Sequence, residues 1–311
     1  MLRLLVLLLF PVLAYGQRNA DVPLVMSARG PVAYAPQGVA TAERVYAGNY
    51  LREDGNLILP ERSEVIVAEK DRLIKLEGPG RFALKDLFAN EKPEGGFLSW
   101  FLNFVSRGFE DSASSENLEK SYERNQGNAQ GNINGYGDRG LAGVHPFGGT
   151  LLAEPTLFTW PRAQDESLYR FRITDSLTGN QVASLVVRDT FIRLDLATLG
   201  LETGQRYVWE ASRSPEALAR IRFGFDRRTA AEVLTPLHER PDFLMVAGTP
   251  LSRLMEAAVL ERDGYLNAAA LRYGESTAGE GDNDLLRRNH AAFLARWNLR
   301  SDAKELLRPY R

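Results

Sequence analysis

The chain has 311 residues, a formal net charge of −2 at pH 7 and no cysteine. This charge balance argues against a nucleic-acid-binding protein, which needs a basic face. The absence of cysteine excludes disulfides, thiolate metal sites, thiol catalysis and lipidation at a processed cysteine. The length suffices for two or three domains.

The first sixteen residues have the order of a secretory signal peptide. Arg3 supplies a positive charge, residues 4–14 are apolar, and small residues precede a cleavage point before Gln17. The apolar run is about eleven residues, whereas crossing a bilayer takes roughly twenty. An uncleaved anchor is the alternative. We therefore expect residues 1–16 to be removed and the mature chain to be exported, as a periplasmic or secreted protein.

Residues 20–90 predict a small antiparallel β domain, because short apolar strands alternate with Gly and Pro turn signals. The expected strands are 24–26, 32–34, 49–51, 57–59, 64–67, 73–76 and 81–84. The succession Gly30-Pro31-Val32, Gly55-Asn56-Leu57 and Ser63-Glu64-Val65 resembles the periplasmic domain of bacterial ferric-citrate regulators (FecR-like domains). Regulators of that family carry an anti-sigma segment ahead of their membrane helix. None precedes the leader in this sequence, so we expect the domain without the regulatory activity.

Residues 91–149 predict a docking helix and a Gly/Asn-rich connector. Apolar residues fall at helical spacing from Leu98 to Phe109, and three large aromatic residues widen this stripe: Phe97, Trp100 and Phe104. Packing against a β domain is the simpler interpretation. Membrane association is the alternative, which the scarcity of basic residues beside the stripe disfavours. Residues 112–125 continue as a solvated polar helix, and residues 127–143 form the irregular connector.

Residues 150–225 predict a second β domain with six strands, at 158–161, 168–173, 181–187, 191–196, 207–211 and 221–225. Leu201, Gly204 and Tyr207 form a Leu-x-x-Gly-x-x-Tyr motif ahead of a late strand, and Trp160 lies near the first strand. This arrangement resembles fibronectin type III and immunoglobulin-like sandwiches. The resemblance implies that the Tyr207 hydroxyl bonds to nearby backbone and that Trp160 fills the core.

Residues 226–311 predict a helical region with an internal repeat. Ala257, Leu260, Ala269 and Tyr273 recur thirty-four residues later as Ala291, Leu294, Ala303 and Leu307. Gly264, at the expected helix–helix turn, is matched by Asn298, which also tolerates left-handed backbone. The period resembles that of degenerate tetratricopeptide repeats, a resemblance that implies grooves for peptides or helices.

The polar residues give no converging catalytic set. The three histidines, His145, His238 and His290, have no partner at metal-ligand spacing. The carboxylates of Glu110, Asp111 and Glu116 are interpreted as a solvated charge run, since a glycosidase pair needs a rigid scaffold. The oxygen donors of the connector include a single carboxylate, whereas calcium loops gather several. We therefore predict no catalytic residue, no cofactor and no metal site.

The predicted fold class is multidomain α+β: a small antiparallel β domain, an immunoglobulin- or fibronectin-like β-sandwich and C-terminal repeat-like helical hairpins. The predicted function is that of a non-catalytic cell-envelope interaction or scaffolding protein with protein or peptide partners. The alternative is an exported glycan-acting enzyme with a site between domains. The candidate partner-binding residues are Phe97, Trp100, Phe101, Phe104, Tyr265, Tyr273 and Trp297. The residues assigned a structural role are Trp160, Leu201, Gly204, Tyr207, Ala257, Ala269, Ala291 and Ala303.

Overall fold

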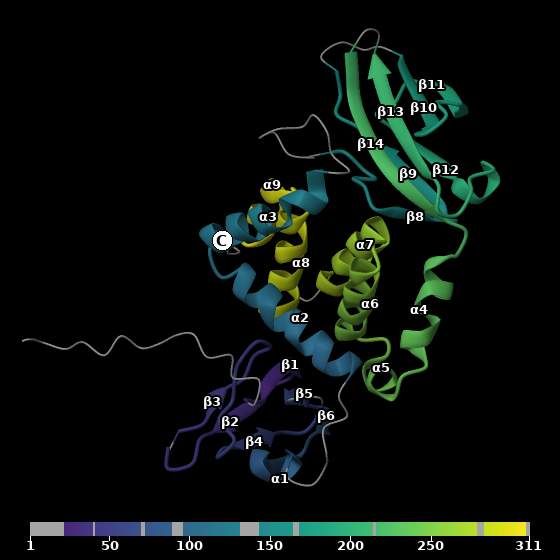
Figure 1. The fold of residues 1–311 in the computed structure, drawn as a ribbon. Coiled ribbons are helices and arrows are strands. Elements are labelled where there is room, and N and C mark those ends of the chain that lie inside the picture. The colour runs from purple at the N-terminus through teal and green to yellow at the C-terminus, as the bar shows by residue number, and fades with distance from the viewer. Residues whose placement is uncertain are drawn as a thin grey trace, which may run out of the picture.

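The computed structural model describes residues 22–39, 41–69, 72–88, 96–130, 143–163, 168–213, 216–278 and 283–308 (Figure 1). The predicted signal peptide and most of the predicted connector lie outside these residues. The fold is mixed α+β, with several antiparallel sheets and a set of helices between them, which agrees with the α+β part of the predicted class. No helix in the described ranges is both long enough and apolar enough to cross a membrane.

The first part of the chain forms two small antiparallel sheets followed by a short helix, α1 (Leu84–Phe88). The three-stranded sheet has the order β1 (Leu24–Arg29), β5 (Glu64–Glu69), β6 (Arg72–Glu77). The four-stranded sheet has the order β3 (Glu43–Arg44), β2 (Ala33–Ala35), β4 (Asn56–Leu59), β7 (Gly80–Ala83). The strand expected at 49–51 is reduced to an isolated bridge between Tyr50 and Leu24. The segment does bond to Val25 of β1, but Asn49 N–H closes a turn onto the Tyr46 carbonyl and Gly48 has a left-handed φ of 93°.

The three-stranded sheet is buried on both faces. Val65 and Val67 of β5 face the core between the two sheets, whereas Ile66 and Ala68 belong to the main core of the molecule. Successive residues of a strand point to opposite faces, so a strand buried on both sides has a continuous apolar sequence. The second face is covered by α2 (Phe97–Asp111), whose Phe101 belongs to the same core.

The second β region has a five-stranded sheet in the order β11 (Gln181–Val187), β10 (Tyr169–Asp175), β13 (Arg206–Arg213), β14 (Glu216–Asp226), β8 (Thr150–Leu152). β9 (Pro155–Thr159) and β12 (Phe191–Asp195) pair with each other in a separate two-stranded sheet, and the short 3-10 helix η2 (Leu196–Thr198) follows β12. Phe158 of β9 meets Phe171 and Trp209 of the larger sheet edge to face, which joins the two sheets. β8, which pairs with β14 in parallel, was not predicted as a strand.

The remaining helices lie between the two β regions (Figure 1). α2 is followed by α3 (Ser115–Gln130), and β14 leads into six helices: α4 (Ala230–His238), α5 (Pro241–Val246), α6 (Pro250–Arg262), α7 (Leu266–Thr277), α8 (Asp284–Arg296) and α9 (Arg300–Leu306). Thr229 caps α4 with Glu232 in a capping box, and Thr249 and Asn283 cap α6 and α8. α2 and α3 both pack against α8, with α2 also reaching α6.

The segment from Val144 to Thr150 joins the second β region to the helices through backbone contacts. Thr150 N–H donates to the carbonyl of Gly264, 2.9 Å away, at the turn between α6 and α7. The Asn267 amide accepts from Phe147 N–H and donates to the Gly148 carbonyl at 2.7 Å. A side chain at Gly149 would collide with the Gly264 carbonyl, which explains the glycine at this position.

Candidate functional site

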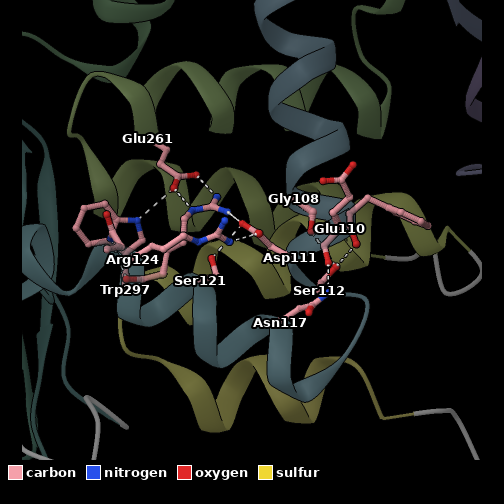
Figure 2. Close-up of polar contacts among 12 residues, drawn as sticks. Gly108, Glu110, Asp111, Ser112, Asn117, Ser121, Arg124, Glu261 and Trp297 are labelled. Atoms are coloured by element: carbon pink, nitrogen blue, oxygen red, sulfur yellow. Dashed lines mark hydrogen bonds and ion pairs between the residues drawn. The ribbon is translucent and has the colours of Figure 1, made fainter. Parts of the chain in front are cut away.

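A buried polar junction holds the α2–α3 hairpin against α6 and α8 (Figure 2). The Arg296 guanidinium makes ion pairs with Glu261, at 2.8 Å, and with Asp111, at 4.0 Å. Asp111 also accepts from the Ser121 hydroxyl at 3.1 Å and is paired with Arg124. All three ion-paired groups at its centre are largely withdrawn from solvent, so their charges have to compensate one another.

Glu261 is the acceptor on the other side of this junction. It accepts from the Tyr273 hydroxyl at 2.8 Å and from the indole N–H of Trp297 at 3.3 Å. Burial opposes the charged form of Arg296, but the charge and hydrogen bond of Glu261, together with Tyr273 and the charge of Asp111, outweigh it and raise the pKa of the guanidinium. Burial raises the pKa of Tyr273 well above its usual range, and Glu261 raises it further. The junction is thus a fixed and neutralised structural contact.

This arrangement corrects the interpretation of the acidic residues after the aromatic stripe. Asp111 is 7% exposed and bound to two arginines, so it is not part of a solvated charge run. The sequence predicted a helix that continues over residues 112–125, whereas α2 ends at Asp111 and α3 begins at Ser115. The partners of Asp111 come from α3 and α8 and cannot be inferred locally. Glu116 does lie in solvent, where it pairs with Lys120 at 2.6 Å.

The aromatic stripe of α2 is covered by arginines from the C-terminal helices. Arg262 lies 4.8 Å from the centre of the Trp100 ring, and Arg296 lies 5.5 Å from that of Phe104. Phe97 and Phe109 are covered in the same way by Arg240 and Arg288. Cation–π contacts of this kind add to apolar packing, so the stripe binds this chain's own helices as well as the first β region.

The other candidate partner-binding residues divide by burial. Phe101, Tyr265 and Tyr273 are buried inside the chain, which removes their rings from any partner in this structure. The Tyr265 hydroxyl donates to Asp226 at 2.8 Å and joins the helices to the end of β14. Trp297 is partly buried against the core, and its indole N–H donates a hydrogen bond to the carboxylate of Glu261.

Each residue assigned a structural role is in a packed or turn position. Trp160, Leu201 and Tyr207 are buried, and Gly204 has the left-handed φ of 83°. The Tyr207 hydroxyl accepts from Glu202 N–H at 2.9 Å, a backbone contact five residues upstream of the kind that the motif predicts. The four alanines of the helical region, Ala257, Ala269, Ala291 and Ala303, have no exposed surface.

The three histidines differ in their surroundings. Burial lowers the pKa of His145 to about 4 and that of His290 to about 4, so both are neutral at pH 7. His238 Nε2 lies 2.9 Å from the carboxylate of Glu256. Among the described residues, no group of three or more His, Cys, Asp or Glu side chains is placed to hold a metal ion.

An open basic pocket lies beside the junction, between the α2–α3 turn and the outer ends of α8 and α9. Its volume is about 360 Å³. In the part of the chain that the structure describes, its walls carry four cationic side chains and a single carboxylate: Arg287, Arg288, Lys304, Arg308 and Asp284. Three serines from the α2–α3 turn add hydroxyl groups: Ser112, Ser114 and Ser115.

The cations of this basic pocket are only partly neutralised. Asp284 pairs with Arg287 at 2.7 Å and with Arg288 at 2.5 Å. Lys304 makes no ion pair with any described residue, and the buried Nε of Arg287 has no hydrogen-bond partner there. Arg308 pairs with Glu305, which is exposed. An excess of positive charge therefore faces the cavity.

Helix α3, which starts at the basic pocket, adds to the positive potential in the cavity. Ser114 caps α3, because its hydroxyl accepts from Asn117 N–H at 3.1 Å. Ser114 and Ser115 both line the pocket, so the N-terminal end of α3, with its partial positive charge, lies at the cavity wall. The arrangement suits a carboxylate or another small anion.

Sequence reasoning missed the basic pocket because its walls come from segments far apart in the chain. The only local signal was the clustering of serines at 112–115 after an apolar helix. The basic residues of α8 and α9 stand in helices where alternating charges are ordinary. In comparisons with known proteins, the chain matched no family model and no curated protein sequence.

Proposed function

We propose that this chain is a non-catalytic, exported interaction protein of the cell envelope, and that its basic pocket takes an acidic segment of a protein partner. The observation that carries the proposal is the excess of cations over carboxylates in an open cavity. Arginine and lysine bind peptide carboxylates through charge-assisted hydrogen bonds, which are stronger than neutral ones.

The leader carries the proposal of export. Residues 1–16 have the charged, apolar and small-residue order of a signal peptide, and they lie outside the described residues. The rest of the chain has folded β regions built without a disulfide, which a periplasm or an extracellular space permits. Localisation therefore rests on the sequence of the leader.

The module assignments support an interaction role. We propose that the second β region is a fibronectin- or immunoglobulin-like sandwich, on the evidence of its two contacting sheets and the Tyr207–Glu202 bond. We propose that the first β region is FecR-like, on the order of its turns and strands. Modules of these kinds serve as binding faces or spacers, although a fold alone does not fix a function.

We further propose that α6–α7 and α8–α9 are two copies of a tetratricopeptide-like repeat. Gly264 and Asn298 both have left-handed backbone, with φ of 84° and 65°. Tyr265 N–H bonds to the Leu260 carbonyl at 2.8 Å, and Leu299 N–H bonds to the Leu294 carbonyl at 2.8 Å. The two helix–helix turns therefore close with the same hydrogen bond, thirty-four residues apart.

The α2–α3 hairpin packs against α8 in this repeat region, so partner binding is assigned to the neighbouring basic pocket and not to the surface under the hairpin. An exported glycan-acting enzyme was the alternative. A catalytic carboxylate pair needs two acidic groups free to act on a substrate. Asp111 and Glu261, the two carboxylates of the junction, are instead bound to arginines.

The proposal is tested by binding of a fluorescein-labelled glutamate peptide to the chain from Gln17 onward. The paired substitution Arg287→Gln with Lys304→Gln should weaken binding about tenfold, which corresponds to roughly 1.4 kcal/mol for two partly exposed charges. The matched control is Arg170→Gln with Arg222→Gln, which removes the same charge from the second β region. Thermal unfolding verifies that both variants are folded. Equal affinity of the two variants would overturn the proposal.

A further inference from the structure

One face of the five-stranded sheet concentrates arginine side chains that neither the core nor the basic pocket uses. Residues alternate between the faces of a strand, and Tyr169, Phe171 and Ile173 of β10 are buried in the interior. Arg170 and Arg172 therefore project from the opposite, outer face. The same parity places the outward residues of β13 and β14 on this face, because Trp209 and Ile221 point inward.

The register between strands shows how these side chains are arranged. Arg172 lies opposite Glu210, and Glu210 lies opposite Arg220. Glu210 accepts from Arg172 at 2.8 Å and lies 3.7 Å from Arg220, so one carboxylate is shared by two arginines. Arg170, Arg206 and Arg222 lie opposite Ser212, Gly224 and Val208, which have no charge to offset them.

Among the described residues of β10, β13 and β14, the outer face therefore carries five arginines and one glutamate, on a chain whose formal net charge is −2. Arg170, Arg206, Arg220 and Arg222 are exposed, and Arg172 keeps 43% of its side chain exposed. Asp226, at the end of β14, is paired with Arg228 and adds no free negative charge. Such a single-sign face has the potential to attract an anionic partner.

We propose that this outer face docks on a membrane surface rich in anionic lipid headgroups. The arginines come from three adjacent strands, which lie about 4.8 Å apart, so the charges spread in two dimensions. A planar array of headgroups can meet all of them, whereas a linear polymer follows one line. Val186 of β11 lies opposite Arg170 on the same face and is 69% exposed, which suits the boundary between headgroups and acyl chains.

Nucleic acid fits the same face less well. Proteins that bind single strands stack bases on aromatic side chains, and the residues that the register places outward on β10, β13 and β14 include no aromatic residue.

The docking depends on salt. Each arginine near an anionic surface contributes a favourable electrostatic attraction that falls off within a Debye length. The docking should therefore weaken as salt is raised.

The experiment is co-sedimentation of the chain from Gln17 onward with vesicles of equal parts phosphatidylcholine and phosphatidylglycerol. We expect binding at low salt and none to vesicles of phosphatidylcholine alone. Arg170→Gln with Arg222→Gln should lower the partition coefficient about thirtyfold, because each arginine near an anionic surface strengthens binding by roughly five- to sixfold. Arg287→Gln with Lys304→Gln removes the same charge from the basic pocket and should leave the partition coefficient within about threefold of the parent.

Three results would overturn the proposal. One is absence of binding to the mixed vesicles. Another is equal loss for the face variant and the pocket variant, which would show that net charge alone decides. The last is retention of the chain on an immobilised anionic polysaccharide without binding to vesicles. The two experiments exchange the test variant and the control variant. The pocket variant is expected to affect peptide binding and the face variant vesicle binding, so failure of one proposal leaves the other measurable.

Discussion

Two clusters of charged residues meet at the α2–α3 turn and differ in how their charges are matched. Asp111 belongs to the buried junction, where Arg296 and Glu261 complete a set of ion pairs. The next residue, Ser112, lines the basic pocket, where four cations face one carboxylate. α8 serves both, because its last residues reach the junction and its first residues reach the pocket.

The difference separates stability from binding. A charge taken out of water is retained only when a partner compensates it, so the junction satisfies its own groups and offers nothing to a ligand. The basic pocket keeps its surplus of positive charge because it remains open to solvent, where a cation without a carboxylate partner costs little folding free energy. Substitutions in the two clusters should accordingly have opposite consequences for folding and for recognition.

The largest effect is expected for Glu261→Ala. This change leaves the Arg296 guanidinium buried with Asp111 as its remaining carboxylate, at 4.0 Å, and leaves the Tyr273 hydroxyl without its acceptor. Breaking a buried pair from one side costs about 3–5 kcal/mol. The free energy of unfolding in urea measures the loss.

Glu116→Ala is the control for this prediction. Its carboxylate pairs with Lys120 on the exposed side of α3, where water screens the two charges, so the change should leave the free energy of unfolding nearly unaltered. If the two variants lost the same stability, the junction would not be the structural contact that its burial indicates.

A smaller effect is expected from pH at His290, which stacks on Tyr273 beside the junction. Burial lowers the pKa of His290 to about 4, whereas an unfolded histidine titrates near 6.5. The unfolded state thus takes up the proton first, and stability is lost as pH falls from about 6.5 towards 4. His290→Gln should reduce this loss by about 1–3 kcal/mol.

Urea unfolding across that pH window measures the change in slope. Below it, Asp226 becomes relevant, because its hydrogen bonds with Arg228 lower its pKa to about 2 and stability is lost as pH falls from 3.8 to about 2. Parallel pH profiles for His290→Gln and the parent chain would contradict the assignment of a neutral, buried imidazole.

The smallest effect on folding is expected for Lys304→Gln in the basic pocket. Lys304 has no ion pair with a described residue, so its removal should change the free energy of unfolding by no more than about 0.5 kcal/mol. The same variant should bind the glutamate peptide more weakly than the parent. A stability loss comparable to that of Glu261→Ala would show that the basic pocket, too, is a structural contact.

Much of the fold follows from local patterns. Alternation of Arg170, Phe171, Arg172 and Ile173 places β10 on a sheet with one wet face, and the structure confirms the strand. Gly264 and Asn298 were expected to be left-handed and are. β3 and β8 were missed because two or three residues give no periodicity, and Leu84 begins α1 where a strand was expected.

The candidate site could not be predicted from the sequence, because its contacts join residues that are far apart in the chain. Arg296 and Asp111 are far apart in the chain, and nothing near either residue predicts the other. The basic pocket depends on how α3 packs against α8 and α9, which a single sequence without contact information does not give. The aromatic residues of α2 were rightly predicted to form a stripe. Their four arginine partners, at the start of α5 and in α6 and α8, could not be predicted from the sequence.

The three-stranded sheet of the first β region also limits how this chain can be divided. Leu24, Met26 and Ile66 lie on the face that α2 covers. A fragment ending near Phe88 would carry that face into water as an apolar patch, a recognised cause of association. The first β region therefore shares its core with elements that follow it in the chain. A shortened chain would expose an apolar surface that promotes association, whereas the full-length protein buries the same residues.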